Sequence, residues 1–246
     1  MSERALLEVD RIGKRFGGVT AVNECSLSVP HDTVTGLIGP NGSGKTTVFN
    51  IITGFVGPDV GEVRFRGEAI QGLAPGLVYK MGIGRTFQSA RVFTRLTAIE
   101  NLLVPVRRTG LHGFVRGFRG AAEAEMAHEV LAQLGLSHVS HQLVGRLSYG
   151  QRRLVELGTV MMCRPGLVLL DEPTAGVHPT VTQALAEYVA ARNKEGISFL
   201  IVEHNLSFVT SICDRLVVLD RGRQIAQGAP AEVVAQQAVV DAYLGD

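Results

Sequence analysis

Gly39-Pro40-Asn41-Gly42-Ser43-Gly44-Lys45-Thr46 is the stretch that decides the fold class, because it satisfies the pattern G-x-x-x-x-G-K-[ST] between an apolar segment, Thr33 to Ile38, and a helix-like one, Thr46 to Ile52. In such a loop, glycines turn backbone N–H groups toward phosphates and the helix N-terminus adds partial positive charge. Lys45 can place its charge between the β- and γ-phosphates, and the Thr46 hydroxyl can ligate magnesium. A nucleotide-binding α/β domain is therefore predicted; a chance match, expected in roughly one such chain in a hundred, is the alternative.

A second apolar segment, Leu167 to Leu170, ends in the acidic pair Asp171-Glu172. Ligands of open α/β sheets bind at the carboxyl ends of the strands. We therefore expect Asp171 to hold magnesium, directly or through water, and Glu172 to orient or deprotonate the attacking water. An ordinary acidic pair at a strand end is the alternative, but a phosphate loop needs a second magnesium ligand from elsewhere in the sheet.

The remaining pattern predicts a mixed α/β chain. Alternation at residues 7–10 and 26–29 is typical of half-buried strands and favours an antiparallel β region. The run Phe199 to Val202 predicts a buried strand, joined to 167–170 through a helix from Ala184 to Lys194 as a parallel unit. Further predictions are a helical lobe from about Ala121 to Leu136, an irregular connection from Arg107 to Gly120, and a closing helix from Ala235 to Tyr243.

Composition limits the possible classes of protein. A chain of 246 residues with 46% hydrophobic residues can bury a core in one large domain or two packed lobes. The net charge of +1 gives no global attraction to nucleic acid. The charged N-terminus and the lack of an apolar run near the ~20 residues of a membrane span favour a cytosolic protein. Cys25, Cys163 and Cys213 are far apart, so we expect small buried residues, not a disulfide or zinc site.

Leu147-Ser148-Tyr149-Gly150-Gln151 resembles the signature motif of the ATP-binding-cassette (ABC) ATPases, whose usual form is Leu-Ser-Gly-Gly-Gln. The resemblance implies that Ser148, Tyr149, Gly150 and Gln151 contact the ATP held by another subunit, so that two subunits enclose two nucleotides. Tyr149 departs from the usual glycine. A capped surface helix is the alternative for this stretch.

The fold implied by this resemblance is a P-loop NTPase of the ABC type, with a parallel core sheet, an N-terminal antiparallel β subdomain and an inserted helical subdomain. We expect one cassette over residues 1–246. The core and β subdomain should occupy about 1–90 and 145–246, and the helical subdomain about 91–144, extending to the signature helix.

Three further positions match the family pattern. Phe16 stands where the family stacks an aromatic ring on adenine, Gln88 resembles the hinge glutamine that reaches the magnesium site, and His204 resembles the histidine that contacts the γ-phosphate and the attacking water. A core phenylalanine, a loop glutamine and a core histidine are the alternatives. His178 stands where the family usually has an aspartate, and no role is assigned to it.

The resemblance therefore implies three sets of site residues. The catalytic set is Glu172, His204 and Gln88, and the magnesium set is Thr46, Gln88 and Asp171. The ATP-binding set is Phe16, Gly39, Pro40, Asn41, Gly42, Ser43, Gly44, Lys45, Thr46 and Thr47.

Residues 81–88, 91–93, 96–102 and 241–246 are similar to the ATPases of branched-chain amino-acid importers, the LivG type. This implies ATP and Mg²⁺ as cofactors, a second ATPase subunit in a homodimer or heterodimer, and membrane-spanning permease subunits that hold the chain at the cytoplasmic face of the membrane. An external binding protein would recognise the substrate, and no nucleic acid is expected. The segment Arg107 to Arg119 is a solvated loop or a lipid or partner contact.

Other functions remain open at this point. Import of urea or amides and export of lipid or polysaccharide use related ATPases. A cassette acting on DNA or ribosomes is disfavoured because there is one cassette and no sustained heptad pattern. A non-hydrolytic scaffold is disfavoured by the presence of Glu172.

Overall fold

The computed structural model describes residues 5–106 and 121–244, which form two compact units. Unit 1 combines Met1–Arg85, Gly166–Glu172 and Val189–Asp246, and unit 2 combines Thr86–Pro165 and Pro173–Tyr188. The connection predicted at Arg107 to Gly120, including the segment to Arg119, lies outside the described residues.

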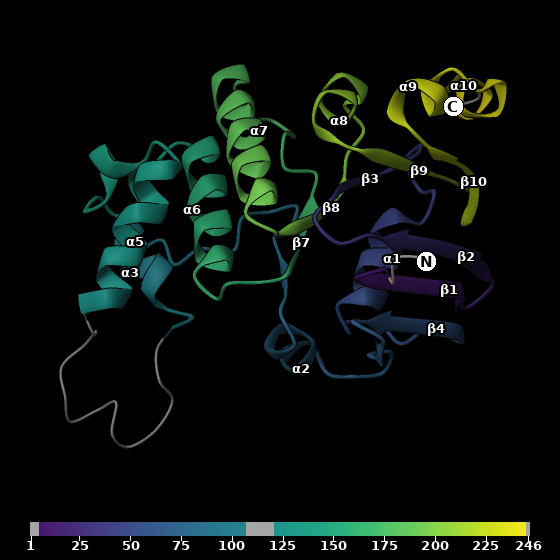
Figure 1. The fold of residues 1–246 in the computed structure, drawn as a ribbon, viewed down its shortest axis with the longest axis horizontal. Helices are drawn as coiled ribbons and strands as arrows, with labels where there is room; N and C mark the ends of the chain where they lie inside the picture. The colour runs from purple at the N-terminus through teal and green to yellow at the C-terminus, as the bar shows by residue number, and fades with distance from the viewer. Residues whose placement is uncertain (1–4, 107–120, 245–246) are drawn as a thin grey trace. The chain divides into compact units, whose positions relative to one another are not determined.

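Unit 1 contains two sheets (Figure 1). One is antiparallel, in the order β2-β1-β4-β5; the other, in the order β10-β9-β3-β8-β7-β6, is parallel except for β10. Their bounds are β1 Leu7–Phe16, β2 Val19–Val29, β4 Val60–Phe65 and β5 Glu68–Ala69 in the first, and β3 Val34–Ile38, β6 Ile83–Arg85, β7 Leu167–Asp171, β8 Ser198–Val202, β9 Arg215–Asp220 and β10 Arg223–Gly228 in the second.

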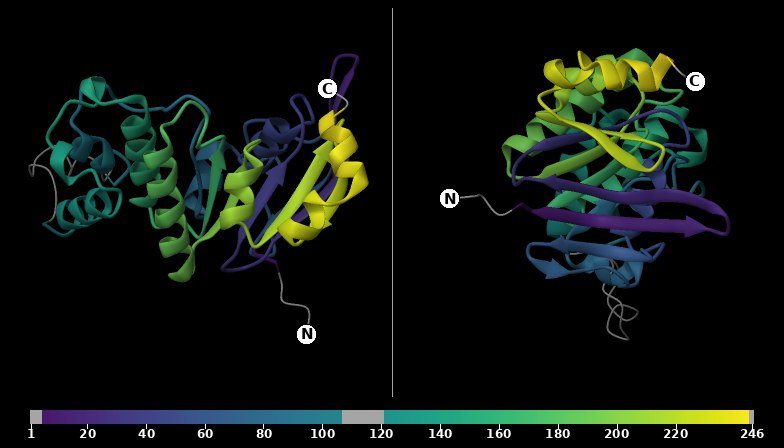
Figure 2. Two further views of the ribbon diagram at one scale, coloured as in Figure 1. Left: turned by 90° about the horizontal axis from the view of Figure 1, so that it is seen from above. Right: turned by 90° about the vertical axis from the view of Figure 1, so that its right-hand side faces the viewer.

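The predicted strands are confirmed, and their burial explains the sequence pattern. In the antiparallel sheet Leu7 pairs with Val29, and buried and exposed residues alternate at the start of β1. The purple and blue strands of this sheet lie beside one another in Figure 2. By contrast every residue of β3, β7 and β8 is buried, as expected for parallel strands covered on both faces.

Five short helices accompany these sheets in the described part of unit 1. They are α1 Lys45–Ile52, α2 Pro75–Lys80, α8 Leu206–Ile212, α9 Pro230–Val234 and α10 Gln237–Leu244. Helix α1 buries Val48, Phe49, Ile51 and Ile52 in the core formed with both sheets. The predicted closing helix is α10, which with α9 lies beside β10 (Figure 2).

Unit 2 is helical where it is described. Its elements are α3 Ala98–Leu103, α5 Ala121–Gln133, the 3-10 turns Ser137–Val139 and Val144–Arg146, α6 Tyr149–Met161 and the first part of α7 Pro179–Lys194. Helix α5 ends before the predicted Leu136, because Gly135 adopts a left-handed φ of 71° that terminates helices. Helix α7 begins five residues before the predicted Ala184, at Pro179, since proline is favoured at the first helical position.

Two further expectations can be compared with the structure. No helix within residues 5–106 and 121–244 is long and apolar enough to cross a membrane. None of the three cysteines, all of which lie in the described part of the chain, forms a disulfide; Cys25 and Cys213 are buried as predicted, whereas Cys163 is only half-buried. Burial raises the pKa of both Cys25 and Cys213 to about 12, so neither thiol is reactive at neutral pH.

Candidate active site

The phosphate loop follows β3 directly, and its shape requires glycine. Gly39, Gly42 and Gly44 have φ angles of 146°, 76° and 104°. A Cβ atom on Gly39 would lie 2.0 Å from the Leu219 carbonyl oxygen, and one on Gly44 would lie 2.5 Å from the Ala21 carbonyl oxygen. The loop is thus enclosed by β9 and β2, and a side chain at either glycine would displace backbone.

Lys45 points into this loop. Its side chain is buried, and Nζ donates to the carbonyl oxygens of Gly39 and Pro40, both at 2.7 Å. Thr46 is exposed and Thr47 half-buried in the first turn of α1, where the helix dipole adds positive potential. A phosphate bound here would therefore meet the ammonium, the helix N-terminus and a hydroxyl together.

A cavity of about 520 Å³ borders the first half of the loop. Its lining comes from the loop, from the end of β9 and the turn after it, from β10 and from α10: Pro40, Asn41, Gly42, Ser43, Asp220, Arg221, Ile225, Ala238, Asp241 and Ala242. Next to these residues of α10, burial raises the pKa of the Tyr243 phenol. Helix α10, near the end of the chain, is thus part of the loop's surroundings.

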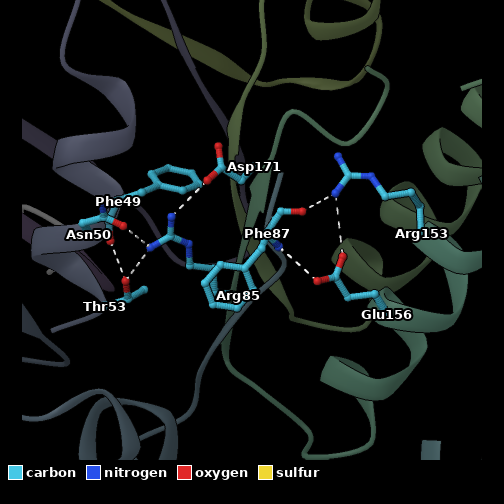
Figure 3. Close-up of polar contacts among 8 residues, drawn as sticks. All are labelled: Phe49, Asn50, Thr53, Arg85, Phe87, Arg153, Glu156 and Asp171. Carbon is cyan, nitrogen blue, oxygen red and sulfur yellow. Dashed lines mark hydrogen bonds and ion pairs between the residues drawn. The ribbon is translucent and has the colours of Figure 1, made fainter. Parts of the chain in front are cut away.

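Asp171 and Glu172 lie at the same edge of the sheet as the loop, because β3 and β7 run parallel on either side of β8. Asp171 is buried, and its Oδ2 lies 2.9 Å from Nη2 of Arg85. Nη1 of Arg85 donates to Asn50 Oδ1 at 2.8 Å and to Thr53 Oγ1 at 2.9 Å (Figure 3). Arg85 was not among the site residues predicted from the sequence, because no local pattern marks its charge as buried.

Glu172 occupies an unusual backbone conformation. Its φ is 45°, in the left-handed region that few residues other than glycine adopt, and its N–H donates to the Val202 carbonyl at 2.9 Å. Backbone strain of this kind persists only where the surrounding structure fixes it, and it is frequent at active sites.

His204 lies in the turn after β8, and hydrogen bonds hold the backbone of this turn. The Glu203 side chain is fully buried, and its Oε2 accepts hydrogen bonds from the N–H groups of His204 at 3.0 Å and Asn205 at 3.3 Å. The imidazole itself is 59% exposed. The core histidine considered as an alternative is therefore wrong, and Glu203, not identified from the sequence, orients the turn that presents the ring.

Phe16 ends β1 with about half of its surface exposed, so the alternative of a core phenylalanine is also wrong. Lys14 Nζ lies 5.7 Å from the ring centroid and 2.6 Å from Asp59 Oδ1. The hydrogen bond from Lys14 lowers the pKa of Asp59. An exposed aromatic face of this kind is available for stacking on a base.

The signature residues and Gln88 belong to unit 2. Ser148 caps α6, accepting from the Gln151 N–H at 3.2 Å, and Gln151 Oε1 accepts from the Ser148 N–H at 3.0 Å. The capped helix that was considered as an alternative is therefore present, and its first residues are those of the signature motif. Gln88 is next to this helix, since its carbonyl accepts a hydrogen bond from the Tyr149 hydroxyl at 3.3 Å.

His178 makes local contacts at the start of α7. His178 precedes α7, and its Nδ1 lies 3.0 Å from Thr180 Oγ1 and 3.4 Å from the Thr180 nitrogen, so the ring takes the place of a helix cap. His138 and His141 belong to no metal cluster: within the described ranges no group of three or more His, Cys, Asp or Glu side chains could hold a metal ion.

Comparison with known proteins places this site in a family. Residues 22–175 match the family model described as ABC transporter, and residues 223–246 match the one described as branched-chain amino acid ATP-binding cassette transporter. The chain belongs to the ABC transporter family.

Three relatives of this ABC cassette are named for transport of branched-chain amino acids. It is 40% identical to the high-affinity branched-chain amino acid transport ATP-binding protein BraF of Pseudomonas aeruginosa, over 99% of both chains. It is 37% identical to LivG of Escherichia coli K12 and to the probable LivG of Methanocaldococcus jannaschii, over 98% of each chain. Import of urea or amides and export of lipid or polysaccharide are therefore not favoured.

Solved structures agree with this assignment. A nucleotide-free ATP-binding cassette from an ABC transporter superposes with a TM-score of 0.88 at 36% identity, covering 99% of this chain and all of the other. An ABC transporter cassette in an ADP conformation gives the same TM-score, identity and coverage. The ABC-type fold and the similarity to LivG-type ATP-binding proteins, both predicted from the sequence, are confirmed.

Proposed function

We propose that this chain binds and hydrolyses ATP to drive import of branched-chain amino acids. It does so as one of two ATPase subunits, identical or related, held by permease subunits at the cytoplasmic face of the membrane. An external binding protein supplies the substrate. The names of its relatives and the C-terminal match at 223–246 support this substrate class. Units 1 and 2 correspond, in this proposal, to the core and helical parts of a single cassette.

One observation carries the hydrolytic function. Lys45 is held inside a glycine loop at the end of β3, and the acidic pair Asp171-Glu172 lies at the same edge of the sheet. Lys45 and the loop N–H groups would hold the β- and γ-phosphates, and Phe16 would stack on adenine. The exposed Thr46 hydroxyl and the Asp171 carboxylate, with Gln88, would supply the hard oxygen atoms that Mg²⁺ prefers. Bound Mg²⁺ would neutralise charge on the phosphates.

Glu172 takes the role of general base. Its carboxylate accepts a proton as the water oxygen bonds to the γ-phosphorus, and the bond to the bridging oxygen breaks, leaving its electron pair on ADP. His204, exposed on a turn fixed by Glu203, and Gln88 orient the water and the γ-phosphate. The constrained backbone at Glu172 keeps the carboxylate at the strand end.

The capped signature supplies the second contact with nucleotide. The N-terminus of α6, at Ser148, Tyr149, Gly150 and Gln151, would bind ATP carried by the other subunit. ATP bound between the two subunits then favours the closed dimer, because it binds the closed state more tightly than the open one. Hydrolysis removes the γ-phosphate that joins the subunits.

Light scattering after size-exclusion chromatography tests this proposal with the Glu172→Gln chain. With ATP and magnesium we expect a dimer, because ATP binds but hydrolysis is nearly abolished, and a monomer without nucleotide. The matched control, Lys45→Ala, should stay monomeric because the loop loses its charge on the phosphates. Hydrolysis by Glu172→Gln at the wild-type rate would refute the assignment of the base.

A further inference from the structure

Three side chains on one face of α6 contact the backbone of residues 87–91, all within unit 2. Tyr149, Arg153 and Glu156 are spaced by four and three residues, so they share one helical face. Figure 3 shows Arg153 and Glu156 extending from the helix toward Phe87.

The contacts bind backbone groups of Phe87, Gln88 and Arg91. Glu156 Oε1 accepts from the N–H groups of Phe87 at 3.2 Å and Arg91 at 3.0 Å. Arg153 Nη1 donates to the Phe87 carbonyl oxygen, so the Phe87 residue is held at both its N–H and its C=O. The next carbonyl along the chain, that of Gln88, accepts from the Tyr149 hydroxyl.

The three side chains differ in their environment. Arg153 and Glu156 are 6% and 3% exposed, and buried charges of this kind are tolerated only with partners. Tyr149 is 44% exposed at the start of the helix, with its ring 5.9 Å from the Arg153 guanidinium. The buried pair Arg153 and Glu156 therefore holds the backbone at Phe87 and Arg91, and the more exposed Tyr149 adds one contact at Gln88.

We propose that Tyr149 is a positioning residue, which holds the backbone of Gln88 against the signature helix and so sets the place of the Gln88 side chain. This rests on the proposed function, in which Gln88 acts at the magnesium site and the signature contacts ATP. Glycine, the usual residue at this position, has no atom that can reach the Gln88 carbonyl. In this chain a side chain of the signature motif, that of Tyr149, is hydrogen-bonded to the backbone of Gln88.

A double-mutant cycle on ATP hydrolysis by the full chain tests the proposal. Tyr149→Phe removes only the hydroxyl, and we expect kcat to fall about two- to tenfold, as for one lost hydrogen bond, with KM for ATP unchanged. In a Gln88→Ala background the same substitution should have no further effect, since the group it positions is gone. An equal fold loss in both backgrounds would overturn the proposal.

Hydrogen exchange supplies a measurement that does not depend on hydrolysis. Tyr149→Phe should speed amide exchange in residues 86–93 without lowering Tm detectably, while Tyr79→Phe, on α2 of unit 1, serves as the matched control and should leave that segment unchanged. Unchanged exchange in Tyr149→Phe would refute the positioning role. If the wild-type chain fails to hydrolyse ATP, the proposed function fails, and exchange still decides whether Tyr149 holds the loop.

Discussion

Arg85 and Phe87 are two residues apart, yet they belong to different units and are held in different ways (Figure 3). In unit 1, Arg85 joins side chains: its guanidinium contacts Asp171 at 2.9 Å, with both side chains at most 7% exposed. In unit 2, Arg153 and Glu156 are equally buried but 3.7 Å apart, because each mainly binds backbone. The first pair fixes where a carboxylate points, and the second fixes the path of a chain.

The largest effect should follow Arg85→Met. It leaves the buried Asp171 carboxylate without its guanidinium, so the free energy of unfolding should fall by about 3–5 kcal/mol in urea titrations. Adding Asp171→Asn should recover part of that loss, because the two side chains are directly coupled. If the double variant is no more stable than Arg85→Met, the pair is not the reason for the loss.

For Glu156→Ala we expect a smaller fall in the free energy of unfolding, about 2–3 kcal/mol, because two backbone N–H groups lose their acceptor. Glu156→Gln is the matched control: its side-chain oxygen can still accept both hydrogen bonds, so it should cost about 1 kcal/mol. Equal losses in the two variants would show that the charge of Glu156, not its hold on the backbone, matters most. Urea unfolding of both chains makes the comparison.

The smallest effect is a pH dependence. Burial raises the pKa of Glu156 above its ordinary value near 4.5, although the N–H groups of Arg91 and Phe87 and the charge of Arg153 oppose the rise. The native carboxyl then binds its proton more tightly than the unfolded one, so its stabilising contribution is present below about pH 4.5 and is lost as pH rises through the native pKa. The stability of wild type relative to Glu156→Gln should therefore fall as the pH rises above about 4.5; a flat difference would contradict the shift.

Much of the fold followed from local pattern. The glycine loop, the buried strands around Leu170 and Val202, and the capped start at Ser148 each have a short-range signal, and each was placed within a few residues. Arg85, Glu156 and Glu203 were missed because nothing local separates a buried charge from an exposed one. Arg153 and Glu156 have the spacing of an ordinary surface pair, and only tertiary packing buries them.

The lack of room for a Cβ atom between Gly39 and the Leu219 carbonyl also bears on how the protein is synthesised and folds. The loop depends on a strand that follows it by about 180 residues, which ribosomes take roughly 10–40 s to add at 5–20 residues per second. Strand β8, which pairs with β3 on the side opposite β9, is also synthesised long after the loop. A nascent chain therefore carries the loop sequence long before it has the loop structure, and nucleotide can stabilise only a chain that already includes β9, not guide its earlier folding.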